Sequence, residues 1–142
     1  MKVKNSDVNL LNICISQILA TSEKLSGSVI FNFNRNAGLL KPLLENIDDT
    51  RKKIIDQHVE KDDKGEILYK EQDSEDAESV KEYLFTKENE ELANIEIQEL
   101  FKEEVDIKLI KLPLSKFETL SLDTSKIPGL NVFIDHIIDE DN

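Results

Sequence analysis

The segment in which chemistry is most readily placed is EKDDKGEILYKE, which begins at Glu60. Gly65 occupies the sixth place of a calcium-loop template, and Glu60, Asp62 and Glu71 occupy its first, third and twelfth places. Calcium takes several oxygen ligands around one turn, and the glycine makes that turn. However, Lys64 occupies the fifth place, where an oxygen ligand is needed, and the residues that follow favour a strand. We therefore interpret this weak candidate for a calcium loop as a solvated hairpin turn and predict no metal site.

Other residues with reactive side chains are few. His58 and His136 show no HExxH spacing and no CxxC motif accompanies them, so they predict no two-histidine metal centre. Cys14 lies in the apolar run LLNICISQIL, which is typical of a small buried hydrophobe and not of a nucleophile. The glycines are scattered singly, so no phosphate-binding loop is present. We predict no catalytic and no cofactor-binding residues, and we expect that the protein is not an enzyme.

The negative charge is concentrated in one part of the chain. The net charge is -12, and residues 60–104 hold 17 acidic residues against 6 lysines. Affinity for nucleic acid comes largely from lysine and arginine, so direct nucleic-acid binding is not expected. A basic partner remains compatible with this charge.

The length and the hydrophobic pattern also bear on the number of domains and on membrane association. A chain of 142 residues has the size of one domain with one core. It has no signal-peptide pattern and no apolar run near the roughly 20 residues that span a bilayer, and it has one cysteine. We expect a single cytoplasmic domain without membrane association.

The elements around the candidate turn are organised by one long amphipathic segment, residues 28–59, which predicts a long helix. Its apolar residues recur at helical spacing and form a stripe that we predict to be an interaction surface. The residues of this stripe are Phe33, Leu40, Leu44, Ile47 and Ile54. Pro42 lies inside the segment, so the pattern leaves open one bent helix or two helices with a break near Gly38.

The remaining segments predict a helix-dominated α+β fold. The start MKVK and the segment 105–112 have strand patterns and are expected to pair in a small sheet. Short β-prone runs predict a hairpin near residues 66–86 with a solvated acidic loop at 72–79. Thr86 is expected to cap a helix that forms a helical hairpin with the long one.

Further expectations concern the faces of the helices. The first helix, ending near Thr21, has apolar positions at Val8, Leu11, Cys14, Ile15, Ile18 and Leu19. The helix after Thr86 is expected to place Leu92, Ile95 and Leu100 on its core side. A turn near residues 115–120 and a last helix from about Pro128 follow, with core positions at Leu130, Phe133, Ile134 and Ile137. The tail 139–142 is expected to fray.

The order of these parts resembles a family of small uncharacterised proteins encoded by tailed bacteriophages and prophages. The stretches that carry the resemblance are MKVKNSDVNLLN, HVEKDDKGE and ELFKEEVDIKLIKLP. The sequence departs from that family at GLLKPLL, which contains Pro42, and at the acidic insert QDSEDAESVK. The resemblance assigns no functional residues, and it implies a phage or prophage origin inside a bacterial host cell.

Together these features favour a non-enzymatic accessory protein that acts by protein–protein interaction. The partner is an unidentified protein, and a two-fold homodimer formed through the helical hairpin is one form of this hypothesis. The alternative is an acidic decoy that mimics nucleic acid and occupies the binding site of a host or phage protein.

Overall fold

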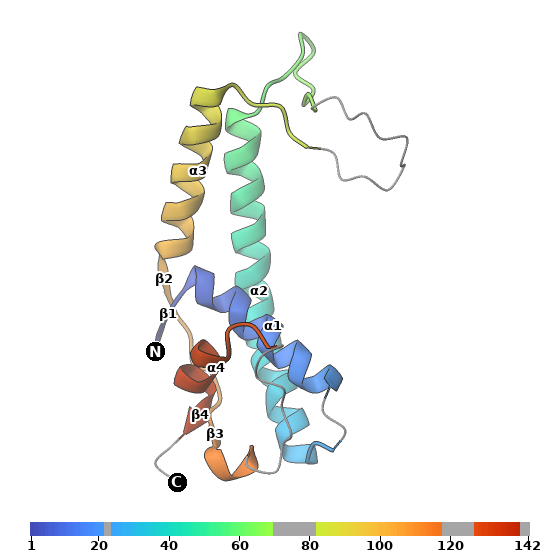
Figure 1. Ribbon diagram of the computed structural model, residues 1–142, viewed down its shortest axis with the longest axis vertical. Helices are drawn as coiled ribbons and strands as arrows, with labels where there is room; N and C mark the ends of the chain where they lie inside the picture. Colours follow the sequence, from blue (N-terminus) through green and yellow to red (C-terminus); the bar gives the residue numbers. More distant parts are fainter. Residues whose placement is uncertain (22–23, 70–81, 118–126, 140–142) are drawn as a thin grey trace. The chain divides into compact units, whose positions relative to one another are not determined.

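The computed structural model describes residues 1–21, 24–69, 82–117 and 127–139. These residues form the helix-dominated α+β fold that the sequence predicts (Figure 1). The elements, in chain order, are β1 (Lys2–Lys4), α1 (Asn5–Thr21), α2 (Gly27–His58), α3 (Lys87–Lys102), β2 (Glu104–Asp106), β3 (Leu112–Pro113), the 3-10 turn η1 (Leu114–Lys116), α4 (Leu130–Ile137) and β4 (Ile138–Asp139).

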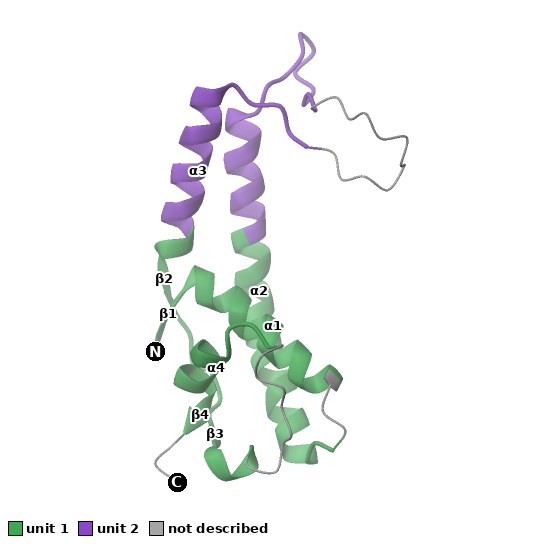
Figure 2. Ribbon diagram, in the orientation of Figure 1, with its two compact units in different colours: residues 1–47, 101–142 green, residues 48–100 purple. Residues whose placement is uncertain are grey.

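The chain divides into two compact units (Figure 2). Unit 1 comprises residues 1–47 and 101–142, and unit 2 comprises residues 48–100. The boundaries between the units fall within α2 and α3.

Unit 1 contains the sheet that the sequence predicts between the chain start and the segment after α3. β1 pairs antiparallel with β2, with Val3 opposite Val105. The predicted strand is shorter than expected, because residues 107–111 form no strand. The chain pairs again at β3, which lies parallel to β4 at Leu112 and Ile138. The second pairing was not predicted from the sequence.

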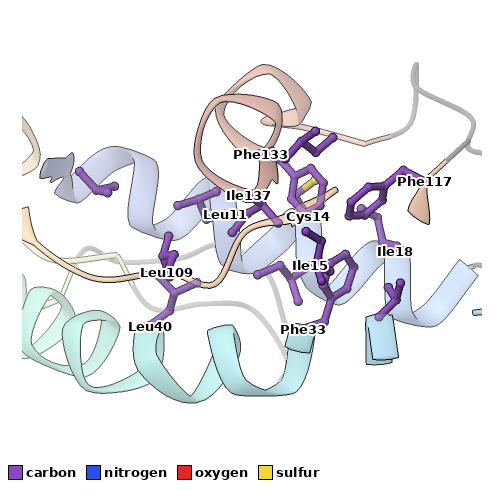
Figure 3. Packing of buried hydrophobic residues seen from close by; sticks show 14 of the residues in the cluster. Leu11, Cys14, Ile15, Ile18, Phe33, Leu40, Leu109, Phe117, Phe133 and Ile137 are labelled. Carbon is purple, nitrogen blue, oxygen red and sulfur yellow. The ribbon is translucent and has the colours of Figure 1, made fainter. Parts of the chain in front are cut away.

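The core of unit 1 forms between α1, α4, the segment after β2 and one side of α2 (Figure 3). Three aromatic rings meet in it: the centroid of Phe33 lies 5.9 Å from that of Phe117 and 5.6 Å from that of Phe133. The ring centroids of the third pair, Phe117 and Phe133, are 5.8 Å apart. This pair and the pair of Phe33 with Phe133 meet edge to face. The predicted core positions of α1 are confirmed, and the buried ones are Val8, Leu11, Cys14, Ile15 and Ile18. In α4, Phe133 and Ile137 are buried as predicted.

The long helix α2 is continuous, which decides between the two alternatives for Pro42. Proline cannot donate to the carbonyl of Gly38, and its ring crowds that carbonyl. Gly38 is exposed and has no neighbour near the position of a Cβ atom, so water can reach the carbonyl instead. Ser26 caps the helix, since its hydroxyl accepts a hydrogen bond from the Val29 N–H at 3.3 Å.

A buried polar side chain connects α2 to the segment between β2 and β3. Asn36 is 0% exposed, and its amide nitrogen donates to the carbonyl oxygen of Ile110 at 2.9 Å. The Ile110 N–H donates in turn to the Asn36 amide oxygen at 2.8 Å. Because Ile110 lies in no strand, this side chain replaces the partner that a sheet would provide.

The entry to α4 depends on a glycine. Gly129 has φ 75°, a left-handed conformation that side chains rarely adopt. A Cβ atom at this position would lie 2.8 Å from the Cβ of Leu10 in α1, so the close approach of the two segments also requires glycine.

Unit 2 has a much smaller core. Among its described residues, only two apolar side chains are buried, those of Val59 and Ala93. The last part of α2 and α3 lie side by side in it with opposite chain directions, the predicted helical hairpin (Figure 2). Thr86 caps α3 as predicted, accepting from the Asn89 N–H at 3.2 Å.

Three segments of unit 2 close on one another beyond the end of α2. Glu60 N–H donates to the Leu84 carbonyl, Leu84 N–H to the Leu68 carbonyl, and Leu68 N–H to the Glu60 carbonyl. The predicted hairpin near 66–86 is present as one antiparallel bridge between Tyr69 and Tyr83. Its predicted acidic loop at 72–79 lies outside the described residues.

The double hydrogen bond of Asn36 yields a first prediction. Asn36→Asp should lower the free energy of unfolding by about 2–4 kcal/mol at pH 7, because a carboxylate cannot donate to the Ile110 carbonyl. Burial beside that carbonyl raises the pKa of the new carboxyl in the folded state. The lost stability should therefore return in part as the pH falls and the carboxyl is protonated.

The measurement is urea unfolding at pH 7 and pH 4. The matched control is Asn34→Asp, an exposed position on the same helix, which should change stability by less than about 0.5 kcal/mol. Equal losses for the two variants would contradict the role of Asn36.

A second prediction follows from the unequal cores of the two units. Amide hydrogens in residues 90–100 of α3 should exchange at least about tenfold faster than those in residues 8–18 of α1. The reason is that opening unit 2 exposes less buried apolar surface to water than opening unit 1, and so costs less free energy. Native-state hydrogen exchange read by mass spectrometry measures this difference. Equal protection of the two helices would show that the units unfold together.

Candidate interaction surfaces

The candidate calcium loop forms a tight turn in unit 2. The carboxylate of Asp62 accepts hydrogen bonds from the backbone N–H groups of Lys64 and Glu66, each at 2.9 Å. Gly65 has φ 82°, as the turn requires. Asp62 and Glu66 are exposed, which confirms the prediction of a solvated turn. One oxygen of Asp62 is thus occupied by the turn itself.

Of the other two template positions, the structure describes only Glu60. Glu60 is half-buried, and Glu71 lies outside the described residues. Across residues 1–21, 24–69, 82–117 and 127–139, no three His, Cys, Asp or Glu side chains lie close enough to hold one metal ion.

Each histidine has a neighbour within its own unit. In unit 2, His58 Nε2 lies 3.1 Å from a carboxylate oxygen of Glu96. In unit 1, His136 Nδ1 lies 3.1 Å from the sulfur of Met1. Cys14 is buried in the core of unit 1, and burial raises the pKa of its thiol to about 11. A thiol with this pKa is a poor nucleophile at neutral pH.

The predicted interaction stripe of α2 is for the most part covered by the chain itself. Phe33 and Leu40 are 0% exposed in the core of unit 1, so the folded monomer does not present them to a partner. Leu44 and Ile47 are half-buried against the same core, and Ile54 is half-buried in unit 2. The part of the stripe that lies in unit 1 therefore faces the core, where α1, α4 and the segment after β2 cover it.

Exposed apolar side chains occur instead on the outer face of α3, which we define by Glu88, Glu91, Leu92, Ile95 and Glu99. Each of these residues lies three or four positions from another member of the set, so they share one side of the helix. Leu92 is 45% exposed and Ile95 is 53% exposed. The three glutamates are exposed as well, so two apolar side chains lie within an acidic rim.

This finding corrects the expected orientation of α3. Of the three residues predicted on the core side, Leu100 is half-buried as expected, whereas Leu92 and Ile95 are exposed. The covered side of α3 also contains the buried Ala93 and the half-buried Ile97. Both sets have helical spacing, so the apolar pattern alone does not distinguish them. Ala93 lies four and seven residues before Ile97 and Leu100, so these three residues share the covered side of α3.

A second exposed face lies on α2 in unit 1. Its outer face consists of Phe31, Arg35, Gly38, Leu39 and Pro42, all exposed. Phe31 is 61% exposed, and the Arg35 guanidinium carbon lies 5.6 Å from the centre of its ring. This distance is typical of a cation–π contact. The face lies on the side of α2 opposite Phe33 and Leu40 and was not recognised in the sequence.

The exposed aromatic pair of unit 2 is a smaller feature. The rings of Tyr69 and Tyr83 stack across their bridge with centroids 5.7 Å apart. Each ring covers part of the other, so the pair stabilises the bridge that joins two segments of unit 2.

The buried thiol yields a third prediction, for alkaline pH. The pKa of Cys14 in the folded protein is about 11, above its ordinary value of 9.0, so the folded state retains the proton longer than the unfolded state. The stability due to the neutral thiol is complete below pH 9 and is lost as the pH rises through 11.

Cys14→Ala should therefore differ less from the native protein at pH 11 than at pH 8, as measured by urea unfolding. The replacement removes packing to the same extent at both pH values, which makes the change with pH the informative quantity. A difference independent of pH would show that the thiol does not titrate in this way.

None of the described helices is both long enough and apolar enough to cross a membrane. Comparisons of the chain with protein-family models, with curated proteins and with solved structures find no match. The resemblance to phage and prophage proteins stays a prediction.

Proposed function

We propose that the protein is a non-enzymatic protein-interaction module that binds its partner through the outer face of α3. The observation that carries this proposal is the exposure of two neighbouring aliphatic side chains, Leu92 and Ile95, on a helix otherwise rich in glutamate. Covering them with a partner would remove apolar surface from water, at roughly 25 cal/mol per Å².

The helix is suited to this role because its opposite side is already used. Ala93 is buried, and Ile97 and Leu100 are half-buried, within the chain. A partner therefore meets a helix that is held in place, and the ordering cost of binding is reduced. The recognition mode would be that of an amphipathic helix packing against an apolar surface.

The acidic decoy is retained as a second candidate function. It is favoured by five exposed glutamates along α3: Glu88, Glu90, Glu91, Glu96 and Glu99. A decoy would depend on these charges, and its binding would weaken steeply with salt. An apolar contact through Leu92 and Ile95 would depend on the aliphatic side chains and much less on salt.

A fourth prediction tests the proposed function. A photo-crosslinking amino acid at Ile95 should give a crosslinked product in cells that produce the protein, whereas the same group at Asn94 should not. Asn94 is exposed on the same helix but lies off the outer face. Electrophoresis and mass spectrometry of the purified product measure the outcome.

Leu92→Glu in the Ile95 crosslinking variant should abolish the product, because a charge replaces the apolar contact. Equal products from both crosslinking positions would contradict a specific face. A product that survives Leu92→Glu and disappears in high salt would favour the acidic decoy.

A further inference from the structure

We propose that the outer face of α3 in one copy binds the outer face of α2 in a second copy of this chain. This inference rests on the proposed function and names the partner of the same site. Both faces are exposed in the folded chain, and their side chains are chemically complementary.

The two faces match in their apolar content. On α2, Phe31 and Leu39 are eight residues apart, about 12 Å along the helix at 1.5 Å per residue. On α3, Leu92 and Ile95 are three residues apart, about 4.5 Å by the same rise. The aliphatic pair is therefore short enough to pack between Phe31 and Leu39, as side chains of one helix pack between those of another.

The charges of the two faces are opposite. Arg35 lies midway between Phe31 and Leu39 and is the charged residue of the α2 face; the exposed Lys41 and Glu45 lie at its edges with opposite charges. Beside its apolar pair the α3 face carries three carboxylates, those of Glu88, Glu91 and Glu99, and Lys102 follows one turn beyond Glu99. Packing the apolar side chains together would bring carboxylates to the guanidinium, a charge-assisted contact.

The distribution of charge over the chain favours the same pairing. Residues 48–100 contain 18 acidic against 8 basic residues, whereas residues 1–47 contain 3 acidic against 5 basic residues. Two α3 faces would place glutamates against glutamates, which repel. The α2 face of a second copy avoids this repulsion and supplies the opposite charge.

One pair of helices makes a small interface, well below the roughly 1,200 Å² of total buried area that stable complexes reach. The association is therefore weak, with a dissociation constant of about 0.1–1 mM per contact. The complex would form where the local concentration of the protein is high.

The test uses purified full-length protein and two complementary variants. The α2-face variant carries Phe31→Glu and Leu39→Glu, and the α3-face variant carries Leu92→Glu and Ile95→Glu. Two controls change exposed residues of the same helices outside the faces, Ile30→Glu and Asn94→Glu. Thermal unfolding by circular dichroism verifies that each variant folds before it is used.

Sedimentation equilibrium up to about 1 mM protein measures the masses. The native protein and both controls should associate, and each face variant alone should remain a monomer. An equimolar mixture of the two face variants should form a one-to-one complex, because one supplies an intact α3 face and the other an intact α2 face.

A native protein that stays monomeric over this range overturns the inference, as does association that the face variants leave unchanged. A mixture that fails to form the complex overturns it too. The proposed function is judged separately: a crosslink from Ile95 to a different protein, together with a monomeric purified chain, would keep the function and reject the second copy as partner.

Discussion

Asn36 lies without exposed surface in the middle of the buried side of α2, and its amide satisfies both backbone groups of Ile110. The segment between β2 and β3 has no strand partner there, so its buried backbone needs hydrogen bonds from elsewhere. An apolar residue in place of Asn36 would leave a donor and an acceptor unpaired inside the core. Together with the buried Val29, Phe33 and Leu40, this side chain sets the rotation of α2 about its axis, and it ties the segment after β2 to the helix.

The fixed rotation determines which residues reach solvent. With Phe33, Asn36 and Leu40 inward, the helical repeat places Phe31 and Leu39 outward. Single exposed apolar residues are common on protein surfaces and require no explanation. Here, however, Phe31 and Leu39 share one side of α2 with an arginine. This arrangement follows from the burial of the opposite side of the helix. The outer face of α2 is thus a consequence of how the core is packed.

The parts that sequence analysis predicted are those with strong local signals. The alternation in MKVK, the apolar repeat of α1 and the capping residue Thr86 each report a local preference, and the structure confirms them. Asn36 was not recognised as a core residue, because a polar side chain is buried only when a distant segment supplies its partner. For the same reason the pairing of β3 with β4, and the contact that requires Gly129 beside Leu10, depend on residues far apart in the sequence.

On α3, too, the hydrophobic pattern alone did not predict which residues are buried. In α3 the larger apolar residues Leu92 and Ile95 are exposed, while the small Ala93 is buried. Hydrophobicity alone ranks these positions in the opposite order, since burial of the larger side chains would remove more apolar surface from water. Ala93 lies on the side of α3 that the chain covers, whereas Leu92 and Ile95 lie on the opposite side, so the rotation of the helix and not side-chain size decides which of them is buried.

The small apolar core of unit 2 affects the stability of that unit. Unit 2 buries little apolar surface within the chain, so a partner on Leu92 and Ile95 would add to its stability as well as occupy a face. Binding and local folding are then linked: whatever covers the outer face of α3 also favours the closed form of unit 2. Because α2 and α3 cross the boundary between the units, the helical structure of unit 2 continues into elements anchored by the core of unit 1. The core of unit 1 thereby reduces the free energy needed to keep α3 folded and available to a partner. The small core of unit 2 alone would stabilise this helix only weakly.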